Sequence, residues 1–224
     1  MQQFSTATLP PVTAMVIDST NALKPGHSKS EQLVSEGLKR VIQKSTGRVI
    51  IGCFASNIAR LQSIGSAAAQ TQRHLALAGR SLRRMTRIAK QTGYLKQDFP
   101  EIPLSDLGYL PNANALVIAT GSQGEPGAAL SRLALDQHPD FALSTEDLVI
   151  LSTKTIPGNE AAVNRMIKGL KAQGAEVIAA DEHEALNLHA SGHPNQEELD
   201  HVYNAVRPYI SVPVHGEPEH LKAS

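Results

Sequence analysis

Histidines in two short stretches near the C-terminus have the clearest chemical potential in this chain. "HASGH" holds His189 and His193 four residues apart, and "PVHGE" places His215 at the end of an apolar segment. A pair at this spacing on a helix can bind a metal ion, but Gly192 favours a loop. Loop imidazoles beside exposed N–H groups equally suit phosphate binding and proton donation. The residues leave both chemistries open, and the other six histidines are expected at the surface or at helix caps.

Polar turns follow several apolar segments. Asp18 ends "VTAMVID" (12–18), a predicted buried strand, and "TGSQGEPG" (120–127) sits between an apolar strand and a helix start. "FASN" (54–57) and "AGRS" (78–81) occupy equivalent positions. Backbone N–H groups in such turns can bind an anion, helped by the helix dipole. A purely structural role fits each single turn as well.

Arginines mark one face of a predicted helix. Arg80, Arg83, Arg84 and Arg87 recur at helical spacing, with Leu82, Met85, Ile88 and Ala89 expected on the opposite side. Guanidinium groups suit phosphate oxygens because their planar forks bind two oxygens at once. The alternative is an arginine face that only meets water.

The net charge of zero hides a strong asymmetry. Residues 37–97 contain no Asp or Glu but 12 of the 21 Lys and Arg residues, so the rest of the chain is acidic. A block of one sign usually faces an anion or an acidic surface, which favours contact with nucleic acid or phosphate. Alternatively, acids folded nearby balance the block.

Strands and helices that alternate along the chain must position these residues. Strands are predicted at 12–18, 48–54, 74–79, 114–120, 147–153, 175–180 and 209–216, and helices at 28–45, 56–72, 81–93, 128–138, 160–173 and around 199–206. Ser28 with Glu31 resembles a capping box, and Ser56 is expected to cap the next helix. The alternation predicts an α/β fold with a mainly parallel sheet and helices on both faces. Sites in such sheets form beyond the carboxyl ends of the strands.

Length and composition narrow the class of protein. The 224 residues suffice for one sizeable domain or two small ones, and aromatic residues make up only 4%. The single cysteine, Cys53, excludes an internal disulfide and predicts a reducing, cytoplasmic setting. We expect Cys53 to be a buried apolar side chain rather than a reactive thiol. No apolar run approaches about 18 residues, so no membrane span is predicted.

Taken together, these stretches resemble ribonuclease J, of the β-CASP group in the metallo-β-lactamase superfamily. The resemblance rests on "DSTNA", "FASNIAR", "GRS", "ATGSQGEPGAALSRLA", "IPGNE", "HASGH" and "PVHGEPEHL", in order along nearly the whole chain. It implies a Rossmann-like β-CASP domain with remnants of a lactamase fold. It also implies a two-zinc enzyme that hydrolyses single-stranded RNA by exonuclease or endonuclease action, with a metal-bound hydroxide attacking phosphorus.

The resemblance assigns roles to individual residues. Asp18 and His215 correspond to zinc ligands, His193 to the proton donor, and Glu125 to an acid that orients a histidine. Substrate contacts are expected from the loop His189, Ala190, Ser191, Gly192 and His193, and from the turn residues Ser56, Asn57, Arg80, Ser81 and Ser122. The implied domains are a tail at 1–11, a lactamase strand at 12–23, the β-CASP domain at 24–185 and a returning lactamase segment at 186–224.

One departure from the family pattern limits what this chain is expected to do. The signature His-x-His-x-Asp-His occurs nowhere in the sequence. Asp18 and His215 are too few for two zinc ions, because each ion needs three or four ligands. We therefore expect weak or absent zinc binding and no RNA cleavage by this chain without the missing lactamase half. Segments 12–23 and 186–221 would lack partner strands, so a homodimer is also expected.

Two other function classes remain open. A stand-alone RNA-binding or regulatory module would keep the fold without the chemistry. An unrelated phosphosugar or nucleotide enzyme would need an acid or nucleophile at the glycine turns, and no convincing candidate stands there.

Overall fold

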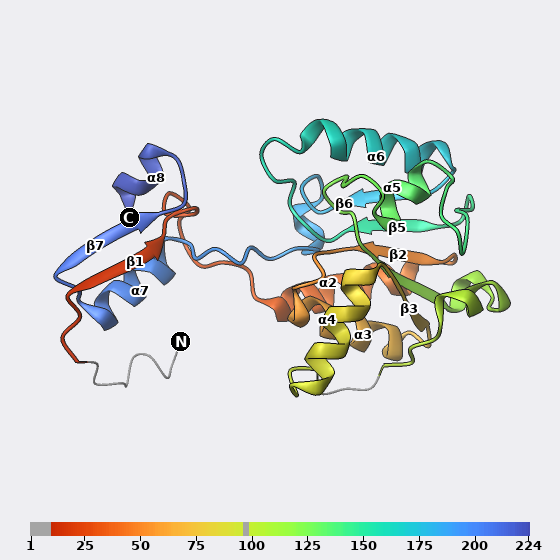
Figure 1. Ribbon diagram of the computed structural model, residues 1–224, viewed down its shortest axis with the longest axis horizontal. Coiled ribbons are helices and arrows are strands. Elements are labelled where there is room, and N and C mark those ends of the chain that lie inside the picture. The colour runs from red at the N-terminus through yellow and green to blue at the C-terminus, as the bar shows by residue number, and fades with distance from the viewer. Residues whose placement is uncertain (1–9, 96–98) are drawn as a thin grey trace. The chain divides into compact units, whose positions relative to one another are not determined.

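The computed structural model describes residues 10–95 and 99–224 (Figure 1). The chain divides into two compact units, and each is described by itself. The five-stranded unit lies within Ser30–Ala190, and the two-stranded unit comprises residues 10–29 together with Ser191–Ser224. No helix within the described ranges is long and apolar enough to span a membrane.

The five-stranded unit is built on a parallel sheet. Its strands are β2 (Val49–Gly52), β3 (His74–Ala78), β4 (Ala115–Ala119), β5 (Leu148–Leu151) and β6 (Glu176–Ala179), in the spatial order β3-β4-β2-β5-β6. Every residue of β2, β4 and β5 is buried. These strands are uninterrupted apolar runs because helices cover both faces of the sheet.

Five helices of the same unit form the two outer layers (Figure 1). They are α2 (Glu31–Lys44), α3 (Ile58–Gln70), α4 (Arg80–Gln91), α5 (Ala129–Ala134) and α6 (Glu160–Ala172). Leu38 of α2 and Ile64 of α3 share one core cluster with Ile51, whereas Leu130 of α5 shares the other with Ile50. Neighbouring residues of β2 thus serve opposite faces, and the predicted parallel sheet with helices on both faces is confirmed.

Two predicted helix caps are wrong by one or two residues. The α2 helix is capped by Ser30, whose Oγ accepts the Leu33 N–H at 3.3 Å, and not by Ser28. The α3 helix is capped by Asn57, whose Oδ1 accepts the Arg60 N–H at 3.0 Å, and not by Ser56. Both sequences offer adjacent capping side chains, and only the backbone geometry selects one.

Two other local predictions need correction. The helix expected at 128–138 ends at Ala134, and Asp136 takes a left-handed conformation with φ 54°. Ile88, expected on the apolar side of α4, is 37% exposed, and Thr86 is buried instead. The buried face of α4 therefore consists of Leu82, Thr86 and Ala89, and the arginines lie on the solvent side.

The two-stranded unit pairs strands from the two ends of the described chain. Strand β1 (Ala14–Asp18) runs parallel to β7 (Ile210–Val214), accompanied by α7 (Gln196–Val206) and α8 (Pro218–Ala223). The prediction that 12–18 is a buried strand is wrong, because Val16 is 68% exposed. Ser28 bonds Glu198 of this unit, donating from N to Oε2 at 3.0 Å and from Oγ to Oε1 at 2.7 Å.

Candidate functional site

The end of the β1–β7 sheet brings together the three residues that the sequence marked for metal or proton chemistry. Asp18 pairs with Val214 in the parallel register, so His215 follows directly at the same end of the sheet. Nδ1 of His193 lies 2.5 Å from Oδ2 of Asp18. The rings of His193 and His215 have their centroids 6.5 Å apart. Residues 175 positions apart in the sequence thus share one site.

Local hydrogen bonds fix the Asp18 carboxylate. Oδ1 accepts the backbone N–H of Thr20 at 2.8 Å and its hydroxyl at 2.7 Å. Partial burial alone would raise the pKa of Asp18, but the hydrogen bonds from Thr20 and His193 outweigh it, and the pKa lies below its ordinary value. Asp18 is therefore ionised near neutral pH and directs the Nδ1 side of the His193 ring toward itself.

Asn21, to which sequence reasoning gave no role, holds the histidine loop. Its Nδ2 donates to Ser191 Oγ and to the carbonyl of His193, both at 3.1 Å. The His193 N–H donates to the same Ser191 Oγ at 3.2 Å. Asn21 is only 3% exposed, so its amide has lost its hydrogen bonds to water, and these two bonds replace them. The stretch "DSTN" carried the signal, since Asn21 lies three residues after Asp18.

His215 adopts a backbone conformation that is uncommon for a residue with a side chain. Its φ is +59°, and Gly216 follows with φ +125°. Left-handed backbone at a non-glycine residue costs energy and is concentrated at functional sites. The turn lets the chain leave β7 while the exposed His215 stays at the sheet end.

The donor groups here do not by themselves make a zinc site. Within residues 10–95 and 99–224, no three His, Cys, Asp or Glu side chains converge so that they could hold a metal ion. Zinc in proteins is held by about three or four side chains. Asp18 and His215 can therefore supply only part of a ligand set.

In the five-stranded unit, the carboxyl ends of three adjacent strands carry the predicted anion-binding turns. Strands β3, β4 and β2 are neighbours, so the turns "AGRS", "TGSQGE" and "FASN" lie along one edge of the sheet. Arg80 and Ser81 are exposed in the first turn of α4, and Ser56 is exposed before α3. Ser122, in contrast, is only 3% exposed, so its expected contact with substrate stays a prediction.

Gln123 is the polar centre of this edge, and sequence reasoning missed it. Its Nε2 donates to the Lys154 carbonyl at 2.9 Å, and its Oε1 accepts the Ile156 N–H at 2.9 Å. Glu125 Oε2 accepts the Gln123 N–H at 2.9 Å. Glu125 thus stabilises its own turn, and its expected role in orienting a histidine stays a prediction.

A buried arginine anchors the segment that leads into the histidine loop. Arg60 is fully buried and donates from Nη1 to the Ser152 carbonyl at 2.7 Å, while Nε binds Glu31 Oε1 at 2.6 Å. Ser152 Oγ donates to the carbonyl of Leu188 at 2.6 Å. One guanidinium group therefore holds four segments together: α2, α3, the end of β5 and residues 188–190.

His189 lies at the end of that anchored segment. Burial, reinforced by the nearby Arg60 charge, lowers the pKa of His189 to about 4. Its Nδ1 is buried with no hydrogen-bond partner among the described residues. His189 is therefore neutral at physiological pH, unlike a histidine that would attract phosphate by its charge.

The basic block at 37–97 is not one surface. Arg48 pairs with the buried Asp147, and Arg60 is enclosed. Arg73 donates to the carbonyls of Gly47 and Ser45, each at 2.7 Å. These three arginines stabilise the interior, so the part of the block that can meet an anion is smaller than the sequence suggests.

One unit is an α/β domain with polar turns at the strand ends, and the other carries Asp18, His193 and His215 at the end of a two-stranded sheet. A fold by itself does not establish a function. The family described as "Ribonuclease J, beta-CASP domain" matches residues 46–170, more than half of the chain. The family described as "Zn-dependent metallo-hydrolase RNA specificity domain" matches residues 184–223. The chain belongs to the ribonuclease J family and carries its β-CASP domain.

Curated relatives agree with this assignment. Ribonuclease J of Sinorhizobium meliloti is 44% identical over 95% of this chain, and ribonuclease J of Thermus thermophilus is 43% identical over 93%. Ribonuclease J2 of Bacillus subtilis is 38% identical over 95% of the chain. The chain spans only 36–38% of the length of these relatives.

Proposed function

We propose that this chain is the RNA-holding portion of a zinc-dependent ribonuclease of the J type, which hydrolyses single-stranded RNA in RNA processing and decay. The observation that carries the proposal is the contact of His193 Nδ1 with Asp18 Oδ2 at 2.5 Å, at a sheet end that His215 shares. Membership of the ribonuclease J family supports it.

In this proposal the residues divide the work between holding RNA and completing the catalytic centre. Asp18 and His215 supply part of the ligand set for two zinc ions, and the remaining ligands come from a lactamase portion with the His-x-His-x-Asp-His signature. Asp18 accepts from the Nδ1 side of His193, which leaves Nε2 to exchange a proton with the leaving oxygen. The loop 189–193 and the turn residues Ser56, Asn57, Arg80, Ser81 and Ser122 contact RNA phosphates, and Glu125 positions a histidine.

A second candidate is favoured by the incomplete donor set. Because no three donors converge within the described ranges, the chain by itself is expected to bind RNA without cleaving it. In that state it acts as a binding module, whether in a cytoplasmic complex with a lactamase portion or as a homodimer.

Two measurements on the purified chain separate these roles. We expect less than one zinc ion per chain by elemental analysis and no degradation of a labelled single-stranded RNA with zinc present. Adding a polypeptide with the His-x-His-x-Asp-His signature should restore cleavage, and Asp18→Asn or His193→Ala should abolish the restored activity. Two tightly bound zinc ions and cleavage by the chain alone would contradict the proposal.

A further inference from the structure

The exposed part of the basic block is concentrated along α4, where it borders a groove. A hollow of about 890 Å³ begins at the carboxyl ends of β3 and β4, where Gly79 and Thr120 line it. Hollows of about 590 Å³ and 650 Å³ continue it, and Arg83 lines all three. We call these three adjoining hollows the α4 groove.

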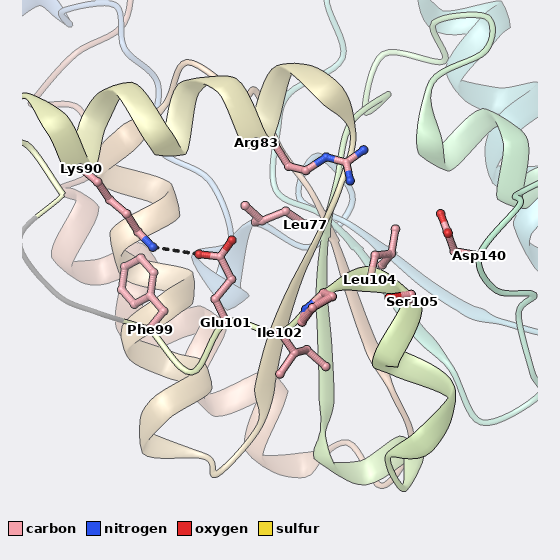
Figure 2. A pocket seen from close by; sticks show the side chains of 10 residues that line it. Leu77, Arg83, Lys90, Phe99, Glu101, Ile102, Leu104, Ser105 and Asp140 are labelled. Carbon is pink, nitrogen blue, oxygen red and sulfur yellow. Dashed lines mark hydrogen bonds and ion pairs between the residues drawn. The ribbon is translucent and has the colours of Figure 1, made fainter.

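The α4 groove follows the helix away from the strand-end turns. It reaches Lys90 and Glu101, and Glu101 is bridged to Leu75 at the opposite end of β3. From Arg80 to Lys90 the helix rises about 15 Å. Figure 2 shows this part of the groove, with Lys90 and Glu101 joined at one end, Arg83 over the middle and Asp140 on the far side. The hollows therefore follow α4 over most of its length, which suits an extended polymer.

Positive charge dominates the groove and is not neutralised from within the protein. Six basic residues line it (Arg80, Arg83, Arg84, Arg87, Lys90 and Arg132) against two acidic ones, Glu101 and Asp140. Glu101 Oε2 is already bound to Lys90 Nζ at 2.9 Å, and Asp140 lies 3.9 Å from His138 Nδ1. Among the described residues, Arg83, Arg84 and Arg87 are exposed and take part in no ion pair within 4.0 Å.

We propose that the α4 groove is a binding surface for the phosphates of single-stranded RNA, read without regard to sequence by Arg83, Arg84 and Arg87. This inference rests on the proposed function and extends the phosphate-binding surface from the strand-end turns along α4. Guanidinium forks bind phosphate oxygens in pairs, and a row of them at helical spacing fits a polymer with regularly repeated phosphates. The exposed positions of α4 along this groove are mainly charged, so charge complementarity favours a polyanion as the occupant.

The test compares RNA length and salt dependence in the full chain, with EDTA present to prevent hydrolysis. Fluorescence anisotropy measures binding of oligoadenylates of about five and about twenty nucleotides. Arg83→Gln/Arg84→Gln/Arg87→Gln should weaken binding of the long RNA by about tenfold or more, and flatten its salt slope by about 2, because each single-strand phosphate contact contributes about 0.7. Affinity for the short RNA should change far less, because the turns and loop still hold it.

Matched variants control for charge and folding. Arg165→Gln/Lys168→Gln/Lys171→Gln removes three exposed charges from α6 and should leave the long-RNA affinity unchanged. Arg83→Lys/Arg84→Lys/Arg87→Lys keeps the charge and should retain the salt slope. All variants should unfold at the wild-type urea midpoint, since the replaced side chains are exposed.

Each other outcome has a defined meaning. Equal loss of affinity for the α6 and α4 variants would overturn the groove as a specific surface, because only total charge would then matter. If the α4 variant bound the long RNA as tightly as wild type, the groove would not be an RNA-binding surface, but the proposed function would still hold. If the wild-type chain bound neither RNA, both would fall. Binding of polyglutamate but not RNA through α4 would reassign the groove to an acidic protein.

Discussion

The two units of this chain contain strands of similar composition that end in different environments. Strands β2 and β5 are buried at every position, whereas β1 and β7 leave Val16 68%, Ile210 55% and Val212 41% exposed. The difference is the number of layers: two helical layers cover the five-stranded sheet, and two paired strands alone cannot enclose a core. The five-stranded unit therefore contains most of the buried apolar side chains. The unit that holds Asp18, His193 and His215 has little core of its own.

The largest expected effect is in the interior of the five-stranded unit. Arg60→Met removes the guanidinium group from Glu31, Ser152 and the Leu188 segment and should lower the free energy of unfolding by about 3–5 kcal/mol, because buried partners lose their bonds. Urea denaturation followed by circular dichroism measures the loss. The exposed Arg165→Met on α6 is the control and should change stability by less than about 0.5 kcal/mol. A loss below about 1 kcal/mol for Arg60→Met would show that the network is dispensable.

A matched pair of truncations compares the two units directly. Leu38→Ala in α2 empties a fully buried position and should cost about 2–5 kcal/mol. Val16→Ala in β1 removes exposed methyl groups and should cost less than about 0.5 kcal/mol. Similar losses at both positions would mean that β1 is covered in solution, as in the expected homodimer, and sedimentation at several concentrations would then detect the partner.

The partly buried His189 should give the five-stranded unit a pH dependence of known sign. Its pKa is about 4 in the folded chain and about 6.5 when unfolded, so between these values the unfolded state binds more protons. The free energy of unfolding should therefore fall as the pH drops from 6.5 toward 4. His189→Asn should flatten that part of the profile measured by urea denaturation, whereas His74→Asn, at an exposed position, should not. Equal profiles for His189→Asn and wild type would refute the assignment.

The smallest expected effect concerns the histidine loop. Asn21→Ala removes two hydrogen bonds from Ser191 and His193 and should cost about 1 kcal/mol locally. Faster hydrogen exchange of the 191–193 amides, with unchanged exchange in β2 and β4, is the expected readout. Thr20→Val tests the neighbouring bond to Asp18 and should leave the loop amides protected. Global destabilisation by Asn21→Ala would show that the two units are not energetically separate.

The sequence by itself determined the parallel sheet and the edge that carries the turns. Apolar runs and turn residues act over a few positions, so β2 to β6 and the helices between them could be predicted from periodicity. The predicted helix caps were wrong by one or two positions because "SKSE" and "ASN" each contain more than one side chain whose oxygen could cap the helix.

Only the tertiary structure decided which polar residues are internal and which meet solvent. Arg60 and Arg84 look alike in the sequence, yet one is enclosed by four segments and the other lines a groove. The contact of Asp18 with His193 joins residues 175 positions apart, and no local pattern encodes such a distance. The physical reason is that burial and pairing depend on which layers fold over a residue, whereas strand and helix depend mainly on its neighbours in the chain.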